Sequence, residues 1–446
     1  MIRQRRRSAF TALAGVLALV LAACGSGGSG SGAQEQQFSD QDVQAALDAG
    51  GTLTVWAWEP TLKQVVDGFQ RKHPRVKVEL VNVGTGDDQY TALQNAIAAG
   101  SGVPDVAQLE YYALPQFALA KSVTDLRTLG ADEYRDTFTP GPWASVHAGE
   151  GVFALPMDSG PMALYYNQEI FQKHGIAVPT TWDEYVAAAR ALHAADPAVY
   201  ITNDIGNAGM ATSMIWQAGG KPYGVDGTNV TIDFSDEGTQ RYTAMWQQLI
   251  SEKLLAPVDS WTDQWYQGLA EGSVATLVTG AWMPANLQSG VAAGAGKWRV
   301  APMPQWKAGE RAGAENGGSG LSIPAASEKK PLAHAFVEYA TTGEGVQLRV
   351  DGGAFPATTE QLSSPEFLNA EFPYFGGQKA NEIFAEEARN VLDGWTYLPF
   401  QVYANSVFND TAGKAYVSDT TLSDGLRAWQ DSSIEYGEQQ GFTVGP

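Results

Sequence analysis

The stretch Gly51-Thr-Leu-Thr-Val-Trp-Ala-Trp58 opens a regular alternation of strands and helices, and this alternation decides the fold class. The stretch alternates and is rich in β-forming residues, which predicts a strand. Residues 61–73 carry apolar side chains at the 3.6-residue period of an amphipathic helix, which stops before Pro74. The pattern continues with a strand over 76–83, a helix over 89–99 and a strand over 104–109. Helices between strands at this spacing indicate β-α-β units, so we predict an α/β fold whose parallel sheet is covered on both faces.

The first residues of the chain have the pattern of an export signal. Four arginines between positions 3 and 7 precede an apolar run over 10–21, which is shorter than the roughly 20 apolar residues of a membrane span. The run ends in Leu21-Ala-Ala-Cys24-Gly25, which resembles a bacterial lipobox. We therefore expect a lipoprotein signal peptide over 1–23 and a lipid on Cys24, the only cysteine of the chain. The arginines leave both the general and the twin-arginine export routes open.

A glycine- and serine-rich stretch follows Cys24, and we expect residues 24–50 to form a flexible tether between the anchor and the folded body. The predicted location is the extracellular face of the cell membrane. Loss of the leader arginines leaves 24 Lys and Arg against 49 Asp and Glu, so the net charge changes from −21 to −25. Such a charge argues against nucleic acid or anionic lipid as a partner, because both are bound by Lys and Arg.

Motifs for cofactor or enzyme chemistry are scarce in this sequence. The five histidines have no metal-ligand spacing, and the glycines at 317–320 lack the Lys-Ser/Thr ending of a phosphate-binding loop. No Gly-x-Ser-x-Gly motif lies between a predicted strand and helix. We therefore expect no cofactor and no metal. Glu59, Glu110 and Asp158 could still face one cleft, so a secreted glycoside hydrolase that uses paired carboxylates remains the alternative.

Seven motifs occur in a fixed order along the chain and together carry a family resemblance. They are the lipobox-like sequence, Thr54-Val-Trp-Ala-Trp58, Pro104-Asp-Val-Ala-Gln108, Ala154-Leu-Pro-Met-Asp-Ser-Gly-Pro161, Pro179-Thr-Thr-Trp-Asp-Glu184, Gly317-Gly-Ser319 and Gly353-Ala-Phe-Pro356. In this order they resemble the extracellular solute-binding proteins of bacterial carbohydrate importers, in particular the maltose-binding group and its actinobacterial lipoprotein relatives. The resemblance implies a monomeric, non-enzymatic receptor that closes on a sugar and delivers it to the permease subunits of an ABC importer. A two-lobe receptor for another solute is a second alternative.

The body of about 400 residues is longer than one hydrophobic core usually serves, so two lobes are expected. The resemblance implies a type II fold with two α/β lobes joined by three crossovers, with the ligand between the lobes. These crossovers are expected near 158–164, 298–303 and 341–352. The N-lobe then comprises residues 51–160 and 300–350, and the C-lobe comprises residues 161–299 and 351–446.

Candidate ligand contacts in the N-lobe follow from the rule that ligands meet the carboxyl ends of the strands in open α/β sheets. Trp58 and Glu59 follow the first strand, although Glu59 could instead cap a helix. Gln108, Glu110 and Tyr111 follow the third strand, where a carboxylate beside an aromatic ring suits sugar hydroxyls and pyranose faces. Glu110 could also be a solvated acid at a helix start.

The first predicted crossover and the C-lobe supply the remaining candidates. Asp158 and Ser159 lie on the crossover, where Asp158 could instead hold the hinge by accepting backbone N–H groups. The 13 tryptophans suggest an aromatic floor, for which we select Trp216, Trp261, Trp282 and Trp395. Core packing is an equal alternative for Trp216, which follows an apolar helix. The resemblance adds Gly318 and Ser319, whose backbone would approach the sugar, and Phe355 at the third crossover. The number of rings favours an oligosaccharide.

Overall fold

The structure is a computed structural model that describes residues 37–445, so the predicted signal peptide, Cys24 and the glycine-serine stretch lie outside the described residues. Residues from Gln37 onward form one compact unit. Two sets of packed elements make up this unit, and we call them the N-lobe and the C-lobe. Among residues 37–445, no helix is both long and apolar enough to cross a membrane.

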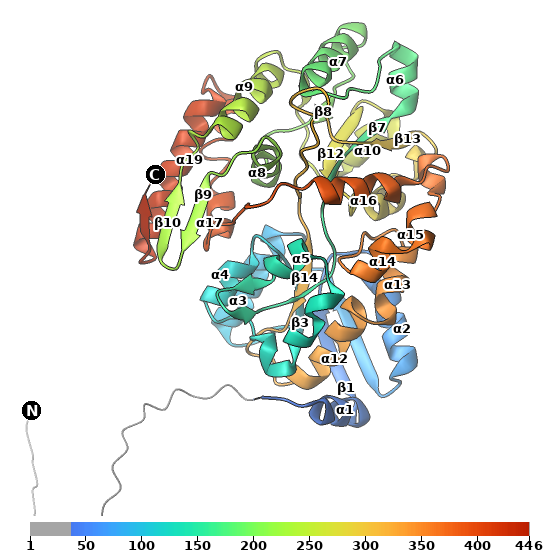
Figure 1. Cartoon of the computed structure of the whole chain (residues 1–446), viewed down its shortest axis with the longest axis vertical. Helices are drawn as coiled ribbons and strands as arrows, with labels where there is room; N and C mark the ends of the chain where they lie inside the picture. Colours follow the sequence, from blue (N-terminus) through green and yellow to red (C-terminus); the bar gives the residue numbers. More distant parts are fainter. Residues whose placement is uncertain (1–36, 446) are drawn as a thin grey trace, which may run out of the picture. The chain divides into compact units, whose positions relative to one another are not determined.

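The N-lobe is built on a five-stranded sheet with the order β2-β1-β3-β14-β6 (Figure 1). The strands are β1 (Gly51–Trp56), β2 (Val76–Val81), β3 (Val106–Glu110), β6 (Leu155–Pro156) and β14 (Ser319–Ser322). β1 pairs in parallel with β2 and β3, as the β-α-β pattern predicts. β14 runs antiparallel to β3 and β6, so the whole sheet is mixed. Four of the five residues of β3 are buried, as expected for a strand covered on both faces.

Helices and a small hairpin cover this sheet. They are α1 (Asp40–Ala49), α2 (Leu62–Lys72), α3 (Asp87–Ala99), α4 (Leu114–Leu119), α5 (Pro140–Ser145), α12 (Lys330–Thr341), α13 (Glu344–Asp351), the 3-10 turns η1 (Leu126–Leu129) and η2 (Ala131–Thr137), and the hairpin strands β4 (His147–Ala148) and β5 (Gly151–Val152). The apolar faces of α2 and α12 meet in one core around Phe69 and Phe336, whose rings pack edge to face.

Helix α1 corrects the predicted tether, because residues 40–49 of the stretch 24–50 are helical. A capping box starts the helix, in which the Ser39 and Asp42 side chains each accept a hydrogen bond from the other residue's backbone N–H. Val43, Ala46 and Leu47 share one helix face and pack against the N-lobe core. The folded body therefore begins before the first strand.

The C-lobe is centred on a three-stranded sheet with the order β12-β7-β13. Its strands are β7 (Met162–Asn167), β12 (Thr276–Gly280) and β13 (Trp298–Ala301), and both outer strands run antiparallel to β7. Two smaller sheets join β8 (Thr202–Asn203) to β11 (Leu255–Ala256), and β9 (Tyr223–Asp226), β10 (Asn229–Ile232) and β15 (Thr443–Gly445) to one another. The parallel sheet expected from the first motifs is thus a property of the N-lobe.

The remaining helices belong to the C-lobe or lead into it. They are α6 (Gln168–His174), α7 (Trp182–Ala195), α8 (Ala208–Gln217), α9 (Glu237–Ser251), α10 (Asp263–Glu271), α11 (Met283–Gly290), α14 (Thr359–Ser363), α15 (Pro365–Asn369), α16 (Ala380–Asn390), α17 (Gln401–Ser406), α18 (Lys414–Val417) and α19 (Leu422–Gln439), with the 3-10 turns η3 (Ala292–Gly294) and η4 (Pro373–Phe375). Trp182, Trp246 and Trp429 are fully buried in the larger C-lobe core. The capping box expected at Thr181 and Glu184 starts α7.

Two of the three expected crossovers lie elsewhere in the chain. The first connects β6 to β7 through residues 157–161, close to the expected 158–164. The second was expected at 298–303, but β13 pairs with β7 inside the C-lobe. The chain returns to the N-lobe at residues 315–319, just before β14, so residues 300–314 belong to the C-lobe. The third was expected at 341–352, but α12 and α13 occupy that stretch and pack on the N-lobe, so the crossing follows Gly352.

Candidate ligand-binding cleft

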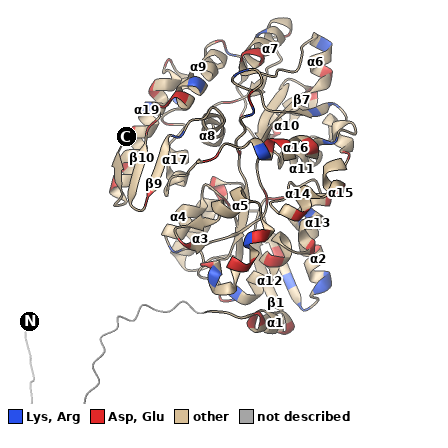
Figure 2. Cartoon of the chain, in the orientation of Figure 1, with Lys and Arg blue, Asp and Glu red and all other residues tan. Residues whose placement is uncertain are grey.

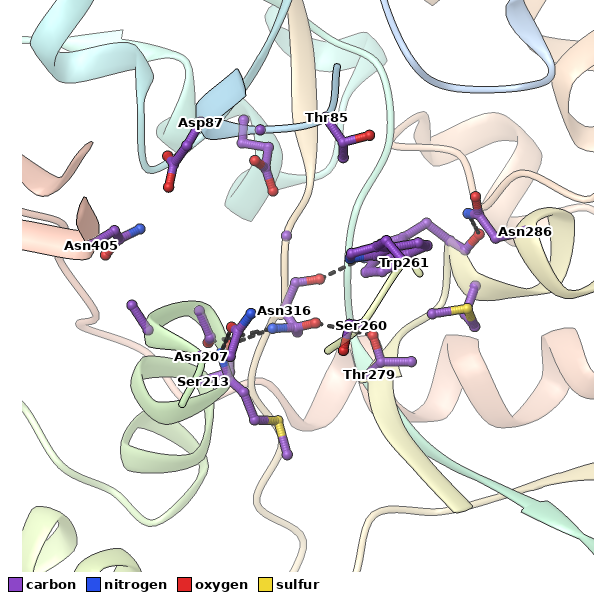
Figure 3. A pocket seen from close by; sticks show the side chains of 18 of the residues that line it. Thr85, Asp87, Asn207, Ser213, Ser260, Trp261, Thr279, Asn286, Asn316 and Asn405 are labelled. Carbon is purple, nitrogen blue, oxygen red and sulfur yellow. Dashed lines mark hydrogen bonds between the residues drawn. The ribbon is translucent and has the colours of Figure 1, made fainter. Parts of the chain in front are cut away.

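A cavity of about 830 Å³ takes its lining from both lobes (Figure 3). On the N-lobe side it is lined by the segments that follow the parallel strands β1, β2 and β3. Their carboxyl ends meet at one edge of the sheet, which is where open α/β sheets bind ligands. The C-lobe side consists of strand, loop and helix residues within 202–213, 259–266, 277–286 and 397–409. Residues 316–319, on the second crossover, join the two sides.

Gln108 organises the turn that carries Trp58 and Glu59. Its Oε1 accepts the backbone N–H groups of Trp58 at 3.1 Å and Glu59 at 3.2 Å, and its Nε2 donates to Ser319 Oγ at 3.0 Å. The side chain is 2% exposed. Gln108 therefore positions two cleft residues and fixes β14 beside them, because its polar atoms are already bonded within the protein.

Glu110 and Asp87 form an acidic corner of the N-lobe side. Glu110 Oε2 accepts the Tyr90 hydroxyl at 2.9 Å, and burial raises the pKa of Glu110 to about 7. The Tyr112 hydroxyl lies 3.4 Å from Asp87 Oδ1, and burial also raises the pKa of Asp87. In Figure 3, Asp87 and Thr85 lie on the same side of the cavity, with Asn405 and Asn316 across from them. A carboxyl group that titrates near neutral pH can accept or donate a hydrogen bond to a ligand hydroxyl.

Asp158 lines the cleft and also holds the hinge. Its Oδ1 accepts the Ser319 backbone N–H at 2.6 Å and the Ser319 hydroxyl at 3.1 Å, so it ties the first crossover to the second. Burial raises the pKa of Asp158 to about 6, while the nearby Arg349 guanidinium partly opposes this rise. Arg349 itself is buried, and its Nε lies 3.8 Å from Glu59 Oε2. The hinge function considered for Asp158 is thus present in the structure.

Trp261 and Trp282 lead the aromatic part of the C-lobe side, which also includes Trp265, Tyr266, Tyr397 and Phe408. The rings of Trp261 and Trp282 stack with centroids 5.8 Å apart, and Trp261 also packs at 5.1 Å against Trp265. Trp282 Nε1 donates to the Asn316 carbonyl at 2.6 Å, which fixes the ring against the second crossover. Trp261 is 42% exposed and has a φ of +70°, a conformation that is rare for a bulky residue. Such strain is typical of functional sites, where the surrounding structure holds it in place.

Neutral amides and hydroxyls make up the polar floor. Asn316 Oδ1 accepts the Thr279 hydroxyl at 3.0 Å, and Asn316 Nδ2 donates to Ser213 Oγ at 3.1 Å. Asn207 caps α8 by accepting the Met210 backbone N–H at 2.8 Å. Figure 3 shows Asn207, Ser213, Asn316 and Thr279 grouped on one side of the cavity, with Asn286 beyond Trp261.

Gly317 connects the two sides at close range. A Cβ atom at Gly317 would lie 2.9 Å from Trp282 Nε1 and 3.7 Å from Glu110 Oε1, and its φ is +77°. The N-lobe carboxylate and the C-lobe ring therefore approach the same point. The neighbouring Gly318 also has positive φ, and a Cβ there would lie 2.7 Å from the Tyr111 ring. Glycine is required at both positions, because other residues rarely adopt a positive φ and a Cβ atom would collide with the neighbouring ring.

Nine of the predicted contact residues line the cleft, namely Trp58, Glu59, Gln108, Glu110, Asp158, Trp261, Trp282, Gly318 and Ser319. Five others lie outside this lining. Tyr111 is buried and donates its hydroxyl to the Asp158 carbonyl at 2.6 Å, and Ser159 donates to Glu315 Oε1 at 2.7 Å.

The other three are aromatic: Phe355 lies in a core, and Trp216 and Trp395 are half-buried rings packed against another core. Trp216 and Trp395 stack on each other at 5.2 Å beside the larger C-lobe core, and Trp216 Nε1 donates to the Leu392 carbonyl. Phe355 is buried against Phe367. Rings on apolar segments pack inward, which was the alternative left open for Trp216.

Most of the polar lining could not be predicted from the sequence. Asp87 follows β2 in the way that Glu59 follows β1, so the same strand-end rule applied to the second strand would have found it. Asn316 adjoins the glycines already selected. Asn207 caps α8, Asn286 and Asn405 lie within α11 and α17, and Thr279 lies in β12; nothing in the spacing of these short polar residues distinguishes them. In the described part of the chain, no group of three or more His, Cys, Asp or Glu side chains could hold a metal ion.

Two lobes joined by three crossovers, with a polar and aromatic cleft between them, define a solute receptor. The sequence matches the family of bacterial extracellular solute-binding proteins over residues 56–347, more than half of the chain, and the protein belongs to this family. The expected type II fold and the expected function, an oligosaccharide-binding receptor of an ABC sugar importer, are confirmed at this level. The protein is a transport receptor and not an enzyme, so the glycoside hydrolase alternative is wrong.

Solved structures and curated relatives agree with this assignment. The ABC transporter associated binding protein from B. animalis subsp. lactis Bl-04, solved in complex with β-1,6-galactobiose, is 46% identical, with a TM-score of 0.86 over 89% of this chain and 100% of that one. The galacto-N-biose-/lacto-N-biose I-binding protein from Bifidobacterium longum is 26% identical, with a TM-score of 0.76 over 89% and 99%. The arabinooligosaccharide-binding protein of Halalkalibacterium halodurans is 25% identical over 73% of this chain and 75% of that protein.

Proposed function

We propose that this receptor captures a short galactose-containing oligosaccharide, of which β-1,6-galactobiose is the first candidate, and hands it to an ABC permease. The observation that carries the proposal is the meeting of Trp282 and Glu110 at Gly317, which offers a ring and a carboxyl group to one sugar unit. An aromatic ring covers the apolar face of a pyranose, and carboxyl and amide groups take its hydroxyls. The 46% identity to the galactobiose complex supports the choice of sugar.

Capture in this proposal proceeds by rotation of the lobes about the three crossovers. The strand-end segments of the N-lobe approach the Trp261–Trp282 pair, and the sugar between them loses its contact with water. Asp158 and Ser319 keep the first two crossovers in register during this movement, because their hydrogen bonds join the two segments. The closed receptor then offers a surface made from both lobes to the permease.

The test is a thermal-shift screen of the chain from Gln37 onward against mono-, di- and trisaccharides of galactose, glucose, arabinose and xylose. A ligand at 100 times its Kd stabilises the folded state by about 2.7 kcal/mol, which raises the unfolding temperature by a few degrees. We expect a response to galactobioses and a smaller one, or none, to arabinose oligomers. A response confined to peptides, amines or ions would overturn the carbohydrate assignment.

The receptor is extracellular by family, and we propose that the lipid on Cys24 holds it at the outer face of the cell membrane. A Cys24→Ser variant lacks the thiol that is acylated, so it should shift from the membrane fraction to the culture medium. Both proteins are expressed with the full chain in a bacterium that processes lipoproteins, and fractions are compared by immunoblot. Equal retention of both proteins on the membrane would contradict the anchor.

A further inference from the structure

The charged residues that line the cleft are all of one sign. Seven carboxylates contribute to the lining, and no lysine, arginine or histidine of the described chain does so. The seven residues are Glu59, Asp87, Asp88, Glu110, Asp158, Asp204 and Asp259. Because closure of the lobes would exclude water and salt from the cleft, like charges in it would then act strongly on any charge that a ligand brings in.

Several of these carboxylates are already balanced within the protein. Asp204 accepts hydrogen bonds from Trp246 Nε1 at 2.9 Å and the Tyr416 hydroxyl at 2.7 Å. Asp158 is bonded to Ser319 and lies near Arg349. Glu59 accepts the Thr61 hydroxyl and also faces Arg349. Asp158 and Glu59 face a cation, and Asp204 is 7% exposed and bonded to two neutral donors, so these three acids offer little charge to a ligand.

Asp87 and Glu110 differ from Glu59 and Asp158, because among the described residues no Lys or Arg is paired with either of them. Glu110 Oε2 is bonded to Tyr90, whereas Glu110 Oε1 points toward the position that a Cβ on Gly317 would take, 3.7 Å away. The Asp87 carboxylate has a single long contact, 3.4 Å, with the Tyr112 hydroxyl. The two acids repel each other's charge, and burial raises the pKa of Glu110 to about 7, so Glu110 is partly ionised at neutral pH. The negative charge of this corner therefore comes from Asp87, its neighbour Asp88 and the ionised fraction of Glu110, while Asp259 adds an exposed carboxylate on the C-lobe side.

The cationic side chains of residues 37–445 lie outside the cleft lining. Arg349 is 1% exposed and donates to the Met157 carbonyl behind the hinge, so it is not offered to a ligand. The other Lys and Arg residues of the described chain lie outside the cleft lining, many of them on outer helices such as α2 and α6 (Figure 2). An anionic group on a bound sugar would thus find carboxylates and neutral amides around it.

We propose that the cleft selects its ligand by charge: it binds neutral oligosaccharides and those that carry a protonated amine, and it excludes oligosaccharides that carry a carboxylate. Asp87 and Glu110 are the specificity-determining residues for this selection. The inference rests on the proposed carbohydrate function and narrows its substrate class to neutral and amino sugars. Uronic acid-containing oligosaccharides of the same linkage fall outside it.

The test compares ligands of one shape and different charge by titration calorimetry on residues 37–446, the compact unit that contains all three hydrophobic cores. β-1,6-Galactobiose is the neutral reference. Its non-reducing unit is converted at C6 into a uronamide, a uronate or a 6-amino-6-deoxy sugar. The reducing end is converted likewise into an aldonamide and an aldonate, so that each carboxylate has a neutral amide of nearly the same shape.

We expect the uronate and the aldonate ligands each to bind about tenfold or more weakly than the matching amide ligand. The 6-amino-6-deoxy ligand should bind at least as tightly as β-1,6-galactobiose. The carboxylate penalty should shrink in Asp87→Asn and Glu110→Gln, and at about 1 M salt, where the Debye length is about 3 Å. Asp183→Asn removes an exposed charge on α7 outside the lining, so it should leave the penalty unchanged.

The outcomes separate the two proposals. If galactobiose binds, and the Kd values of the acid and amide ligands agree within twofold at both the non-reducing and the reducing end, charge selection is overturned. The carbohydrate function would then still stand. Binding of no sugar at all would overturn the carbohydrate function, and charge selection would fall with it. If acid ligands lose as much affinity relative to their amides in Asp87→Asn and Glu110→Gln as in the wild type, Asp87 and Glu110 are not the cause of the loss. Their assignment as specificity-determining residues would then be overturned.

Discussion

Replacing Trp282 with alanine tests the aromatic side of the cleft. The change removes a ring that stacks on Trp261 at 5.8 Å, and it removes the hydrogen bond from Nε1 to the Asn316 carbonyl at 2.6 Å. A ring stacked on the sugar contributes about 0.5–1.5 kcal/mol to binding beyond its buried area, and the hydrogen bond to Asn316 contributes by holding the ring in position for the sugar. The expected loss of at least about 0.5–1.5 kcal/mol corresponds to sugar binding at least about 2- to 13-fold weaker.

The assay is titration calorimetry with the sugar found in the thermal-shift screen. Trp282→Phe keeps a ring but lacks the N–H donor, so its Kd should lie between those of the wild type and Trp282→Ala. Trp143→Ala is the matched control, because Trp143 packs on Phe138 in the N-lobe and does not line the cleft. A folded Trp282→Ala variant whose Kd stays within twofold of wild type would refute the stacking argument, as would an equal loss in Trp143→Ala.

Two further predictions concern the hinge. Burial raises the pKa of Glu315 and Glu110 to about 7 and that of Asp158 to about 6, so between about pH 4.3 and pH 7 the folded state holds protons that the unfolded chain has released. The stabilisation that these protonated carboxyl groups give the folded state is complete below the pKa values of the unfolded chain and is lost as pH rises through 6–7. The unfolding temperature should therefore fall between pH 5 and pH 8. Glu315→Gln, neutral at every pH, should flatten this slope in a calorimetric scan, and an unchanged slope would speak against the assignment. Arg349→Met should lower the free energy of unfolding by about 3–5 kcal/mol in urea, because it leaves Glu59 and Asp158 without their buried cation. Arg241→Met breaks an exposed pair on α9 and should cost less than about 1 kcal/mol, so equal losses in both variants would contradict this reasoning.

Much of the fold could be predicted from local sequence signals. The capping box at Thr181, the helix period before Pro74 and the alternation after Gly51 each specify an element without reference to the rest of the chain. The second crossover could not be placed in this way. Residues 298–301 and 319–322 both form strands, and only their partners, β7 in the C-lobe and β3 in the N-lobe, show which lobe each belongs to.

The candidate site could be predicted where polar or aromatic residues stand at the carboxyl ends of predicted strands. Trp58, Glu59 and Glu110 follow strands whose carboxyl ends meet at one sheet edge, and these residues line the cleft. Trp282 follows β12 in the same way. Trp216 and Trp395 pack on each other because tertiary contacts decide whether a ring faces a core or a cleft, and ring type alone does not. The amide-rich floor, with Asn207 and Asn316, was not visible because such residues are equally common in turns and caps.

The central claim is that this receptor binds a neutral oligosaccharide in its cleft and releases it unchanged. The most direct test is a calorimetric titration of residues 37–446 with β-1,6-galactobiose, followed by chromatography of the sugar recovered after denaturation of the protein. The account predicts one site per chain, a Kd in the micromolar range or below, about −8 kcal/mol or more favourable, and intact disaccharide. The absence of binding to this and other neutral galacto-oligosaccharides, or recovery of free galactose, would contradict it.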